Sequence, residues 1–536
     1  MLDENDNLTV TTNYGPLQGI HGKNPSIRIF KGIPYAKPPT GSLRWKEPQR
    51  PEPWNDIRKA FEFGPVGPQL NTQEISAMNL PMDEDCLYLN IWAASGTRPK
   101  PVLVWIYGGG FQEGTSADPN FDGESMAERG IIVVNFNYRL GILGFLATQS
   151  LSSESPHGVS GNYGFLDCVA ALRWVHENIA AFGGDPSNVT IAGQSAGAGT
   201  CDFLAMSPLA KGLFQRVIAQ SHARYSRDTE LRYLSTSYRN IIEAEDAGER
   251  FVRRLCTTDE APTLERLREV PWQELTDSKL YGDIQINTGS DSKPPLFRPV
   301  VDGWSIPHGF EYTYASGEQN DVDYIVGNNL DESGAIPTEC VTDAREKQKD
   351  ERWRPGRPPT HVTLESFVRA AKYKYRDMAD EFLSVYSASN DDEAAAADSR
   401  AVRDNARISS FLWAQEWRKH CNRPVRTYFW THRTPDGSGQ RRAFHGSEIT
   451  YAFDNLNRFS RNWTAEDVRV SKIISAYWVN FIATGDPNGD GLPEWKEYDP
   501  NVPKVMDLGS DFVMRDIASP KAFSFWQRFF ATQQAW

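Results

Sequence analysis

The stretch FGGDPSNVTIAGQSAGA, residues 182–198, decides the fold. Its centre, VTIA at 189–192, is a short apolar run typical of a buried strand. It leads directly into GQSAG at 193–197, the only G-x-S-x-G sequence in the chain. The small residues that follow can begin a helix. A serine on a tight turn between a strand and a helix is typical of a catalytic nucleophile, because the glycines tolerate strained backbone and the helix dipole favours negative charge at Ser195.

The segments around this turn predict alternating strands and helices. PVLVWI at 101–106 and IIVVNFNY at 131–138 are continuous apolar runs, as expected for strands buried on both faces. Between 165 and 182, apolar residues recur at helical spacing, and the segment closes on a helix stop, GGDP at 183–186. This alternation indicates an α/β fold with a mostly parallel sheet and helices on its faces.

Downstream of residue 200 the pattern loosens, but no repeat or linker divides the chain. Helical spacing is visible at 364–386 and 468–484, and strand-like runs occur at 324–327 and 426–430. The charged, proline-broken region 340–360 is expected to be an exposed loop. We therefore expect residues 1–536 to form a single catalytic domain with long insertions.

A second glycine-rich turn supplies candidate hydrogen-bond donors for chemistry at Ser195. YGGGF at 107–111 follows the predicted strand 101–106. Consecutive glycines expose backbone N–H groups, and an acyl-transfer enzyme needs two or three such donors aimed at a tetrahedral oxyanion. The amides of Gly109, Gly110 and Ala196 are the candidates for this oxyanion hole.

Composition excludes several classes of function. Of 536 residues, 57 are Lys or Arg and 70 are Asp or Glu, and the net charge of −13 disfavours binding to nucleic acids or anionic membranes. No apolar run approaches the ~18 residues of a membrane helix. The N-terminal sequence MLDENDNLTVTTNYG is polar and acidic, so no secretory signal is expected. The six cysteines form no pattern typical of a disulfide scaffold or zinc site, so neither a metal nor a cofactor is expected.

Phrases spread along nearly the whole chain resemble the type-B carboxylesterase family, which includes cholinesterases, mammalian carboxylesterases and fungal lipases of the Candida type. They are EDCLYLNIW (84–92), WIYGGGF (105–111), NYRLGILGFL (137–146), FGGDPSNVTIAGQSAGA (182–198), FRPVVDG (297–303), FHGSEI (444–449) and FIATGDPN (481–488). The resemblance implies an α/β-hydrolase fold. Its large mixed, mostly parallel central sheet would carry helices on both faces, with helical and loop insertions covering the catalytic edge.

The resemblance also assigns roles to individual residues. It implies a catalytic triad of Ser195, Glu332 in GNNLDESG and His445 in FHGSEI, in the chain order of the hydrolase fold. His445 would take the proton of Ser195, and Glu332 would fix the imidazole. Ser221, in the phrase AQS, matches a serine that supports the acid. The other histidine nearby, His432, is expected in a surface loop.

Two ion pairs carry over by position as structural links: Arg44 with Glu84, and Arg139 with Asp167. The family's disulfides do not carry over. The position expected to pair with Cys86 is Gly67, and Cys256 lacks a partner because 266–268 reads Arg-Leu-Arg. The loss of both bonds favours a cytoplasmic protein, the alternative being secretion after removal of a signal peptide.

Several residues near the nucleophile differ from those common in the family, and these differences affect which substrates are expected. Gln194 stands where cholinesterases and many relatives carry Glu, which removes a negative charge beside the acyl site. Ser76 aligns with the tryptophan that binds choline in cholinesterases, so choline esters are disfavoured. His222 and Ser333 stand where the family commonly has Gly, and both are expected to reshape the pocket near the triad or slow hydrolysis.

These features predict a serine carboxylesterase that acts through an acyl-enzyme on a small, neutral, apolar ester, as a monomer or homodimer. An acyltransferase, lactonase or amidase using the same triad is the alternative. A binding module like the neuroligins is disfavoured, because those relatives lack the serine that is present here. The native substrate and its acyl and alcohol sizes are set by loops that sequence patterns do not resolve.

Overall fold

The computed structural model describes residues 8–70, 73–96, 98–223, 225–228, 239–256, 262–276, 295–332, 362–435 and 441–535, with the backbone alone at 73 and 74. The region 340–360, expected to be an exposed loop, lies outside these ranges.

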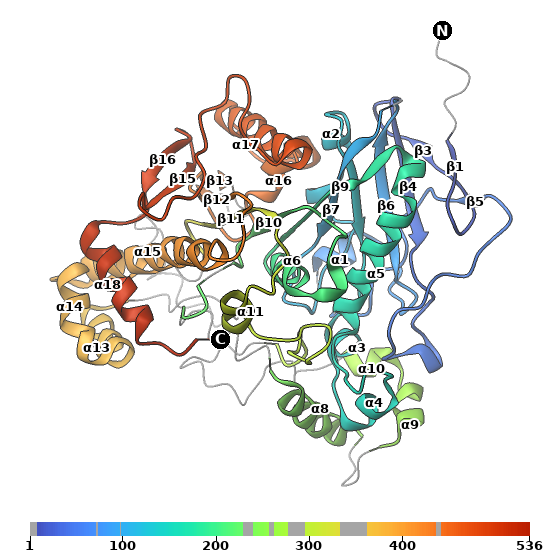
Figure 1. Cartoon of the computed structure of the whole chain (residues 1–536), viewed down its shortest axis with the longest axis horizontal. Helices are drawn as coiled ribbons and strands as arrows, with labels where there is room; N and C mark the ends of the chain where they lie inside the picture. Colours follow the sequence, from blue (N-terminus) through green and yellow to red (C-terminus); the bar gives the residue numbers. More distant parts are fainter. Residues whose placement is uncertain are drawn as a thin grey trace.

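One large sheet crosses the molecule in the order β16-β15-β12-β11-β10-β9-β7-β8-β6-β4-β3 (Figure 1). Neighbouring strands are parallel from β8 through to β15 and antiparallel toward both edges. The predicted mixed, mostly parallel sheet is therefore confirmed. Its strands are β3 (Ile20–His21), β4 (Ile27–Pro34), β6 (Tyr88–Ala94), β7 (Lys100–Ile106), β8 (Ile132–Phe136), β9 (Gly184–Gln194), β10 (Arg216–Gln220), β11 (Asp323–Asn329), β12 (Val425–Trp430), β15 (Lys504–Leu508) and β16 (Val513–Asp516).

Two smaller sheets lie beside the large one. One has the order β1-β2-β5, and the other pairs β13 with β14. Their strands are β1 (Thr9–Thr11), β2 (Pro16–Gln18), β5 (Arg58–Lys59), β13 (Thr434–Pro435) and β14 (Arg441–Arg442).

Four of the helices, α2, α5, α6 and α17, pack against the central strands β7, β8 and β9, most of whose residues are buried. The helices are α1 (Gln73–Ala77), α2 (Glu124–Ala127), α3 (Gly141–Phe145), α4 (Gln149–Glu154), α5 (Tyr163–Asn178), α6 (Ala196–Met206), α8 (Ile241–Leu255), α9 (Leu264–Glu269), α10 (Trp272–Thr276), α11 (Phe310–Ser316), α13 (Leu364–Tyr375), α14 (Ala379–Val385), α15 (Asp391–Trp417), α16 (Ile449–Ala452), α17 (Ala465–Thr484) and α18 (Pro520–Ala531).

The elements predicted around the nucleophile agree closely with the structure. The predicted strands 101–106, 131–138 and 189–192 correspond to β7, β8 and the second half of β9. The predicted helix 165–182 is α5 continued by a short 3-10 turn, and Gly183 ends it in the left-handed conformation at φ 91°. The strand-like runs 324–327 and 426–430 lie within β11 and β12.

The C-terminal helices differ more from the sequence pattern. The predicted helix 364–386 is two helices, α13 and α14, because Arg376 takes a left-handed φ of 49° and turns the chain between them. The long helix α15 was not predicted. Its N-terminus is capped by the Asn390 side chain, which accepts a hydrogen bond from the Glu393 amide at 3.0 Å.

Helices α13, α14, α15 and α18 gather at one end of the molecule, at the lower left of Figure 1, below β15 and β16 in this view. Their facing sides bury a second apolar cluster that is rich in aromatic rings, centred on Tyr375, Phe382 and Phe525. The larger core lies along the central strands and the helices packed on them. The long insertions therefore have a core of their own next to the sheet.

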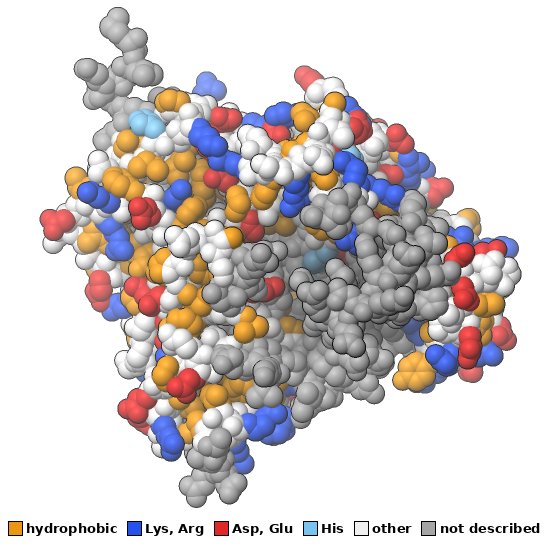
Figure 2. Space-filling view, turned by 180° about the vertical axis from the view of Figure 1, so that it is seen from behind, with side chains coloured by type: hydrophobic (Ala, Val, Ile, Leu, Met, Phe, Trp, Pro, Cys, Tyr) orange, Lys and Arg blue, Asp and Glu red, His pale blue; other side chains and the backbone are white. Residues whose placement is uncertain are grey.

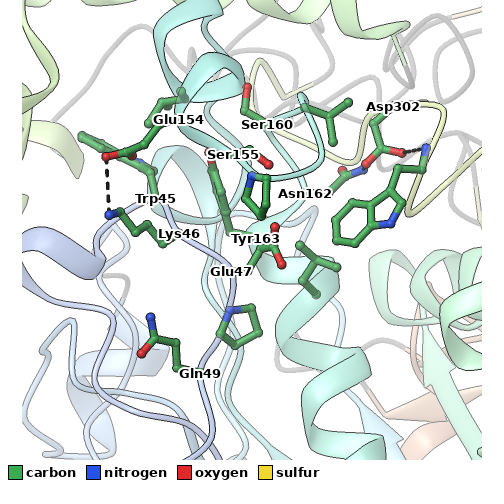
Figure 3. A pocket seen from close by; sticks show the side chains of 16 residues that line it. Trp45, Lys46, Glu47, Gln49, Glu154, Ser155, Ser160, Asn162, Tyr163 and Asp302 are labelled. Carbon is green, nitrogen blue, oxygen red and sulfur yellow. Dashed lines mark hydrogen bonds and ion pairs between the residues drawn. The ribbon is translucent and has the colours of Figure 1, made fainter.

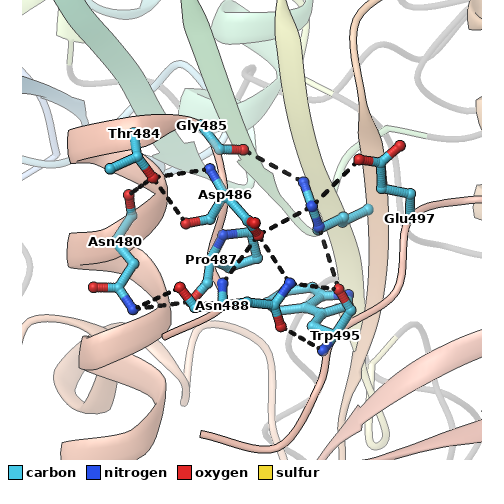
Figure 4. Close-up of polar contacts among 9 residues, drawn as sticks. Asn480, Thr484, Gly485, Asp486, Pro487, Asn488, Trp495 and Glu497 are labelled. Carbon is cyan, nitrogen blue, oxygen red and sulfur yellow. Dashed lines mark hydrogen bonds and ion pairs between the residues drawn. The ribbon is translucent and has the colours of Figure 1, made fainter. Parts of the chain in front are cut away.

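The segment FIATGDPN, residues 481–488, connects the end of α17 to β12 (Figure 4). Gly485 ends the helix with φ 86°, which a residue with a side chain rarely adopts. The buried Arg426 guanidinium on β12 donates to Gly485 O at 3.3 Å and to the Asp486 carboxylate at 3.1 Å. The Asn488 side chain closes the turn by accepting from the Trp495 amide at 2.7 Å. This phrase therefore has a structural role.

The described surface carries mixed charges. In Figure 2, Lys and Arg side chains are interspersed with Asp and Glu over the described part of that face. None of the helices in the described residues combines the length and the apolar character needed to cross a bilayer.

Candidate active site

Ser195 lies on the turn between β9 and α6, in the strained conformation expected of a nucleophile elbow. Its φ is 57° and its ψ is −126°. The flanking glycines are required by close packing: a Cβ at Gly197 would lie 2.0 Å from Ile106 O, and a Cβ at Gly193 would lie 2.5 Å from the Gly197 carbonyl carbon. The Ser195 amide donates to Gln220 O at 2.9 Å, which anchors the turn to β10.

The glycine-rich turn after β7 lies directly against this serine. A Cβ at Gly108 would lie 3.0 Å from the Ser195 Cβ and 2.6 Å from Gln194 O. Gly109 and Gly110 have φ values of 106° and 62°, and a Cβ at Gly109 would lie 2.0 Å from Glu113 O. The turn therefore needs glycine for its conformation, and Gly108 packs against Ser195 just before the start of α6.

Glu332 follows the end of β11 and is almost fully buried, with 5% of its surface exposed. The Ser221 hydroxyl, just beyond β10, donates a hydrogen bond to Glu332 Oε1. Ser221 is held by its own amide, which donates to Gly327 O at 2.8 Å. Residues after two adjacent parallel strands therefore meet at one edge of the sheet, and this places the expected acid next to the expected supporting serine.

His445 lies between Glu332 and the nucleophile turn. Its Nδ1 is 3.4 Å from Glu332 Oε1, and its Nε2 is 3.1 Å from the Gln194 side-chain nitrogen. Half of the His445 side chain is exposed, whereas Gln194 and Glu332 are buried. Glu332 thus contacts one nitrogen of the His445 imidazole, and Gln194, the chain neighbour of Ser195, contacts the other.

The position of Gln194 beside Nε2 of His445 affects which protons and hydrogen bonds the imidazole can accept. With the Nδ1 proton donated toward Glu332, the Nε2 lone pair is the site that a neighbouring hydroxyl proton would reach. The Gln194 amide donates to the same lone pair. A carboxylate at this position would place a negative charge beside the imidazole, whereas the glutamine amide is uncharged.

Asp331, to which no role was assigned from the sequence, ties the segment that carries Glu332 to the segment that carries His445. Its carboxylate accepts from the Ala443 amide at 2.9 Å and pairs with Arg403 of α15 at 2.9 Å. The Asp331 amide in turn donates to Ala443 O at 3.0 Å. One residue thus holds the chain just before Glu332 against the chain just before His445. Its position directly before Glu332 in the sequence was the signal that could have identified it.

Glu448 was quoted within FHGSEI but given no role. It is fully buried, and it accepts hydrogen bonds from the side-chain amides of Gln220, at 2.9 Å, and Asn329. Burial raises the pKa of Glu448, the Glu332 charge adds to the rise, and the two amides oppose it. Its partners stand at the ends of β10 and β11, so it connects the strands that carry Ser221 and Glu332.

His222, one of the noted departures, points into the protein. Its Nδ1 lies 2.7 Å from an Asp202 carboxylate oxygen on α6, and the Tyr324 hydroxyl donates to the same carboxylate. All three side chains are buried. A Cβ at Gly199 would lie 2.7 Å from His222 Nε2, so the glycine makes room for the imidazole under α6. The other departure, Ser333, lies outside the described residues.

The expectation for His432 was wrong. This histidine is buried, and its Nε2 lies 2.8 Å from Asp467 Oδ1. Arg441, Tyr451 and Thr464 also donate to Asp467. A buried carboxylate at the start of α17 therefore draws His432 inward, a contact that separate sequence segments do not show.

Both expected ion pairs are confirmed. Arg44 and Glu84 are buried and share two hydrogen bonds, with Arg44 Nε at 2.7 Å from the carboxylate. Arg139 binds Asp167 through Nε at 2.8 Å and Nη2 at 2.7 Å. Two parallel bonds per pair give them the geometry of strong charge-assisted contacts.

The five described cysteines are all unpaired, four of them buried. They are Cys86, Cys168, Cys201, Cys256 and Cys421, and Cys340 lies outside the described ranges. Burial raises the pKa of the Cys86 thiol well above its usual range. The part of the chain that the structure describes contains no group of three or more His, Cys, Asp or Glu side chains able to hold a metal ion.

Comparison with known proteins places this geometry in context. The Carboxylesterase family matches residues 6–526. The chain belongs to this family. It is 34% identical to fumonisin B1 esterase of Sphingopyxis macrogoltabida, over 93% of this chain and 86% of the relative. It is 30% identical to para-nitrobenzyl esterase of Bacillus subtilis (strain 168), over 95% and 96% of the two chains.

A solved structure of a PNB esterase superimposes with a TM-score of 0.76 at 28% identity, covering 97% of this carboxylesterase and 100% of the other chain. The similarity extends over nearly the whole length of both proteins. The α/β-hydrolase fold implied by the sequence phrases is confirmed, and the carboxylesterase is a carboxylic ester hydrolase.

Proposed function

We propose that this carboxylesterase cleaves small, neutral, apolar esters through an acyl-enzyme on Ser195, with His445 as the general base and Glu332 as the acid of the triad. The observation that carries the proposal is the strained Ser195 turn, next to an imidazole whose Nδ1 faces a buried carboxylate at 3.4 Å. A strained serine beside an oriented histidine is the arrangement of nucleophilic catalysis.

In this mechanism the Ser195 oxygen attacks the ester carbonyl while its proton moves to His445 Nε2. The imidazolium is stabilised by Glu332, and it returns the proton to the leaving alkoxide, which departs as an alcohol. Water then attacks the acyl-enzyme through the same base, releasing the acid and free Ser195. The amides of Gly109, Gly110 and Ala196 would bind the oxyanion in both steps.

The neutral side chain of Gln194 supports a neutral substrate. A carboxylate at this position would favour a positively charged alcohol group, and the amide offers no such attraction. Two of its relatives, fumonisin B1 esterase and para-nitrobenzyl esterase, are esterases by name. Their names support ester hydrolysis as the reaction class, and the acyl and alcohol preferences of this chain are left to measurement.

The test uses a phosphonate or sulfonyl fluoride on the folded protein. One equivalent should attach to Ser195, located by peptide mass spectrometry, and ester hydrolysis should stop in proportion to labelling. Ser195→Ala should take no label and lose at least about 10⁴-fold in kcat. Ser187→Ala, at an exposed serine in the first half of β9, is the matched control. Labelling elsewhere, or activity retained in Ser195→Ala, would contradict the proposal.

Product analysis separates hydrolysis from the alternative reactions. The enzyme is incubated with a p-nitrophenyl acyl ester, with and without a primary alcohol or amine. A hydrolase releases the free acid under both conditions, whereas an acyltransferase forms the new ester or amide as the main product. Hydrolysis of an amide or a lactone at a higher kcat/KM than the matching ester would favour the amidase or lactonase.

We also propose a cytoplasmic location, a single catalytic domain over 1–536, and a monomer or homodimer. The unpaired cysteines support a reducing compartment, since both family disulfides lack one partner. Thiol titration of the denatured, unreduced protein should find all 6 cysteines free. Four or fewer free thiols would favour secretion. Sedimentation of the purified protein measures its oligomeric state directly.

A further inference from the structure

A cleft separate from the candidate active site lies between the chain at Trp45–Gln49, the start of α5 and the loop after Asp302 (Figure 3). Its volume is about 360 Å³, within the range of small-molecule sites. A second cavity of about 400 Å³ adjoins it and shares Glu47 and Trp304 as lining residues. We call the first cavity the Glu47 cleft.

The walls of the Glu47 cleft are held by buried hydrogen bonds. Lys46 O accepts from Arg139 Nη1 at 2.8 Å, which fixes one wall to the ion pair inside the protein. The Asp302 carboxylate accepts from the amides of Trp304 and Ile306, both at 2.9 Å. A preformed site loses less conformational entropy on binding a ligand than a mobile one does.

The backbone at the edge of the cleft is strained. Trp45, which is buried, has a φ of 56°, a conformation that bulky residues rarely adopt. Its indole N–H donates to Ile142 O at 2.9 Å and holds the residue in this state. The next two residues, Lys46 and Glu47, line the cleft. Strained residues in proteins are often found at binding sites.

An aromatic surface borders the cleft next to Glu47. The His157 ring stacks on the Trp304 indole, with ring centroids 3.7 Å apart and planes 12° from parallel. The His157 amide donates to Ser155 Oγ at 3.2 Å, which fixes the histidine loop. The indole lines both cavities, so an apolar or aromatic group lying in the cleft would contact it.

Of the three carboxylates that line the cleft, two have their hydrogen bonds satisfied. Glu154 pairs with Arg268 at 3.0 Å and lies 3.4 Å from Lys46 Nζ. Asp302 accepts from the two backbone amides described above and from the Ser305 hydroxyl at 2.6 Å. Glu47 is different.

Glu47 Oε1 is shielded from solvent and accepts no hydrogen bond from the described residues. His157 Nε2, at 3.7 Å, is too far for a hydrogen bond. Burial raises the pKa of the Glu47 carboxyl, and His157 acts in the opposite direction. An incoming donor with a positive charge would offset this cost of burial.

We propose that the Glu47 cleft binds a protonated primary or secondary amine with an apolar or aromatic body, at a site separate from Ser195. The ammonium group donates hydrogen bonds to the Glu47 carboxylate, and the body of the ligand packs against Trp304. Charge supports this choice: Glu154 pairs with Lys46 and Arg268, and among the described residues no lysine or arginine forms an ion pair with Glu47 or Asp302. In the adjoining cavity, Glu47 and Glu177 are balanced by Arg50 and Arg173, so the cation is expected in the first cavity.

The test measures binding of 2-phenylethylamine by isothermal titration calorimetry. Two matched compounds isolate the recognition: 2-phenylethanol lacks the charge, and the trimethylated ammonium derivative keeps the charge but has no N–H. The amine should bind at least about tenfold more tightly than either compound. Equal binding of the three, or no binding of the amine at millimolar concentration, would overturn the proposal.

Variants locate the site. Glu47→Gln keeps the size of the side chain and removes its charge, and it should weaken amine binding about tenfold or more while leaving 2-phenylethanol unaffected. Trp304→Ala should weaken both compounds. Glu265→Gln, at an exposed glutamate on α9, is the control with the same charge change and should bind as wild type does. Amine binding unchanged in Glu47→Gln would place the site elsewhere.

The experiment is independent of the proposed esterase mechanism. The titrations are repeated on Ser195→Ala, in which amine affinity should equal that of wild type because the cleft shares no lining residue with the triad. Loss of amine binding in Ser195→Ala would place the amine at the active site and refute a separate site. Failure of covalent labelling at Ser195 would leave the amine result intact.

Discussion

Replacing Gly67 with cysteine should create a disulfide with Cys86. A Cβ built on Gly67 lies 3.3 Å from Cys86 Sγ and 3.9 Å from Cys86 Cβ. Disulfides have Cβ–Cβ distances of about 3.5–4.5 Å, so the pair is already at bonding geometry. The nearest other atom, Tyr138 O, is 3.8 Å away, and Gly67 does not have a left-handed φ. Gly67→Cys should therefore fit without moving the backbone.

The expected gain in stability follows from the loop that the bond closes. Cys86 and residue 67 enclose about 20 residues, and the entropy removed from the unfolded chain corresponds to about 3 kcal/mol. Formation of the bond should be slow in the native protein. Burial raises the pKa of the Cys86 thiol well above its usual range, and the thiolate is the reactive form. Oxidation should therefore succeed during refolding with a glutathione couple.

The assay compares Gly67→Cys, refolded under oxidising and reducing conditions, with Gly67→Ser, which has nearly the same size but cannot form the bond. Mass spectrometry of the unreduced digest should show residues 67 and 86 linked, and the urea midpoint should rise only in the oxidised variant. Absence of the link after oxidative refolding would refute the geometry. A link with an unchanged or lower midpoint would refute the entropic estimate.

Three further changes probe the candidate site and its surroundings. Gln194→Glu should move the acid limb of the pH–rate profile up by about one pH unit, because a carboxylate beside Nε2 stabilises the protonated base. Asp331→Asn should lower kcat about 10- to 100-fold with little change in fold. The substitution weakens the contacts through which Asp331 holds the segment before His445 and Arg403 of α15 together. Asp467→Asn should cost about 3 kcal/mol of stability at neutral pH, measured from urea unfolding, because it leaves its buried partners unmatched.

The pH dependence of the last variant has a definite sign. Burial alone would raise the pKa of Asp467, but hydrogen bonds from His432, Arg441, Tyr451 and Thr464 outweigh it and hold the pKa well below its usual range. The stabilisation is therefore fully present above the unfolded value near 4 and is lost as pH falls toward the native value. The free energies of unfolding of wild type and variant should approach each other as the pH falls below about 4. A constant difference between them would contradict this reasoning.

The other two variants also have outcomes that would count against them. An unshifted pH profile in Gln194→Glu would mean that residue 194 does not face the base during turnover. For Asp331→Asn, the matched control is Asp516→Asn on the edge strand β16, whose carboxylate is exposed. Equal kcat in the two variants would show that the tie between Asp331 and Ala443 does not position the base.

Local sequence predicted the elements that depend on local chemistry. The apolar runs of β7 and β8, the Gly-rich elbow and the helix stop at Gly183 were visible because strand burial and left-handed turns restrict the residues allowed there. The ion pairs Arg44–Glu84 and Arg139–Asp167 came from resemblance alone, since no local rule pairs residues so far apart.

Other features depended on contacts between distant segments. The predicted helix 364–386 divides at Arg376, and Tyr375 of the first helix and Phe382 of the second both pack against Phe525 of α18. His432 is buried because Asp467 on α17 accepts its hydrogen bond. Asp331 gained a role only when Ala443 and Arg403 were brought to it.

The sequence by itself determined the fold class, the nucleophile turn and the family. These depend on short segments in which the backbone conformation restricts the residues allowed, or in which the residues match a family motif. Only the tertiary structure decided that the imidazole of His445 lies between Glu332 and Gln194, that Gly67 is within bonding distance of Cys86, and that Glu47 lines a cleft with an unmatched oxygen. The physical reason is that burial and hydrogen bonding are satisfied by the folded chain as a whole, and the partners of a side chain are not chosen by its neighbours in sequence.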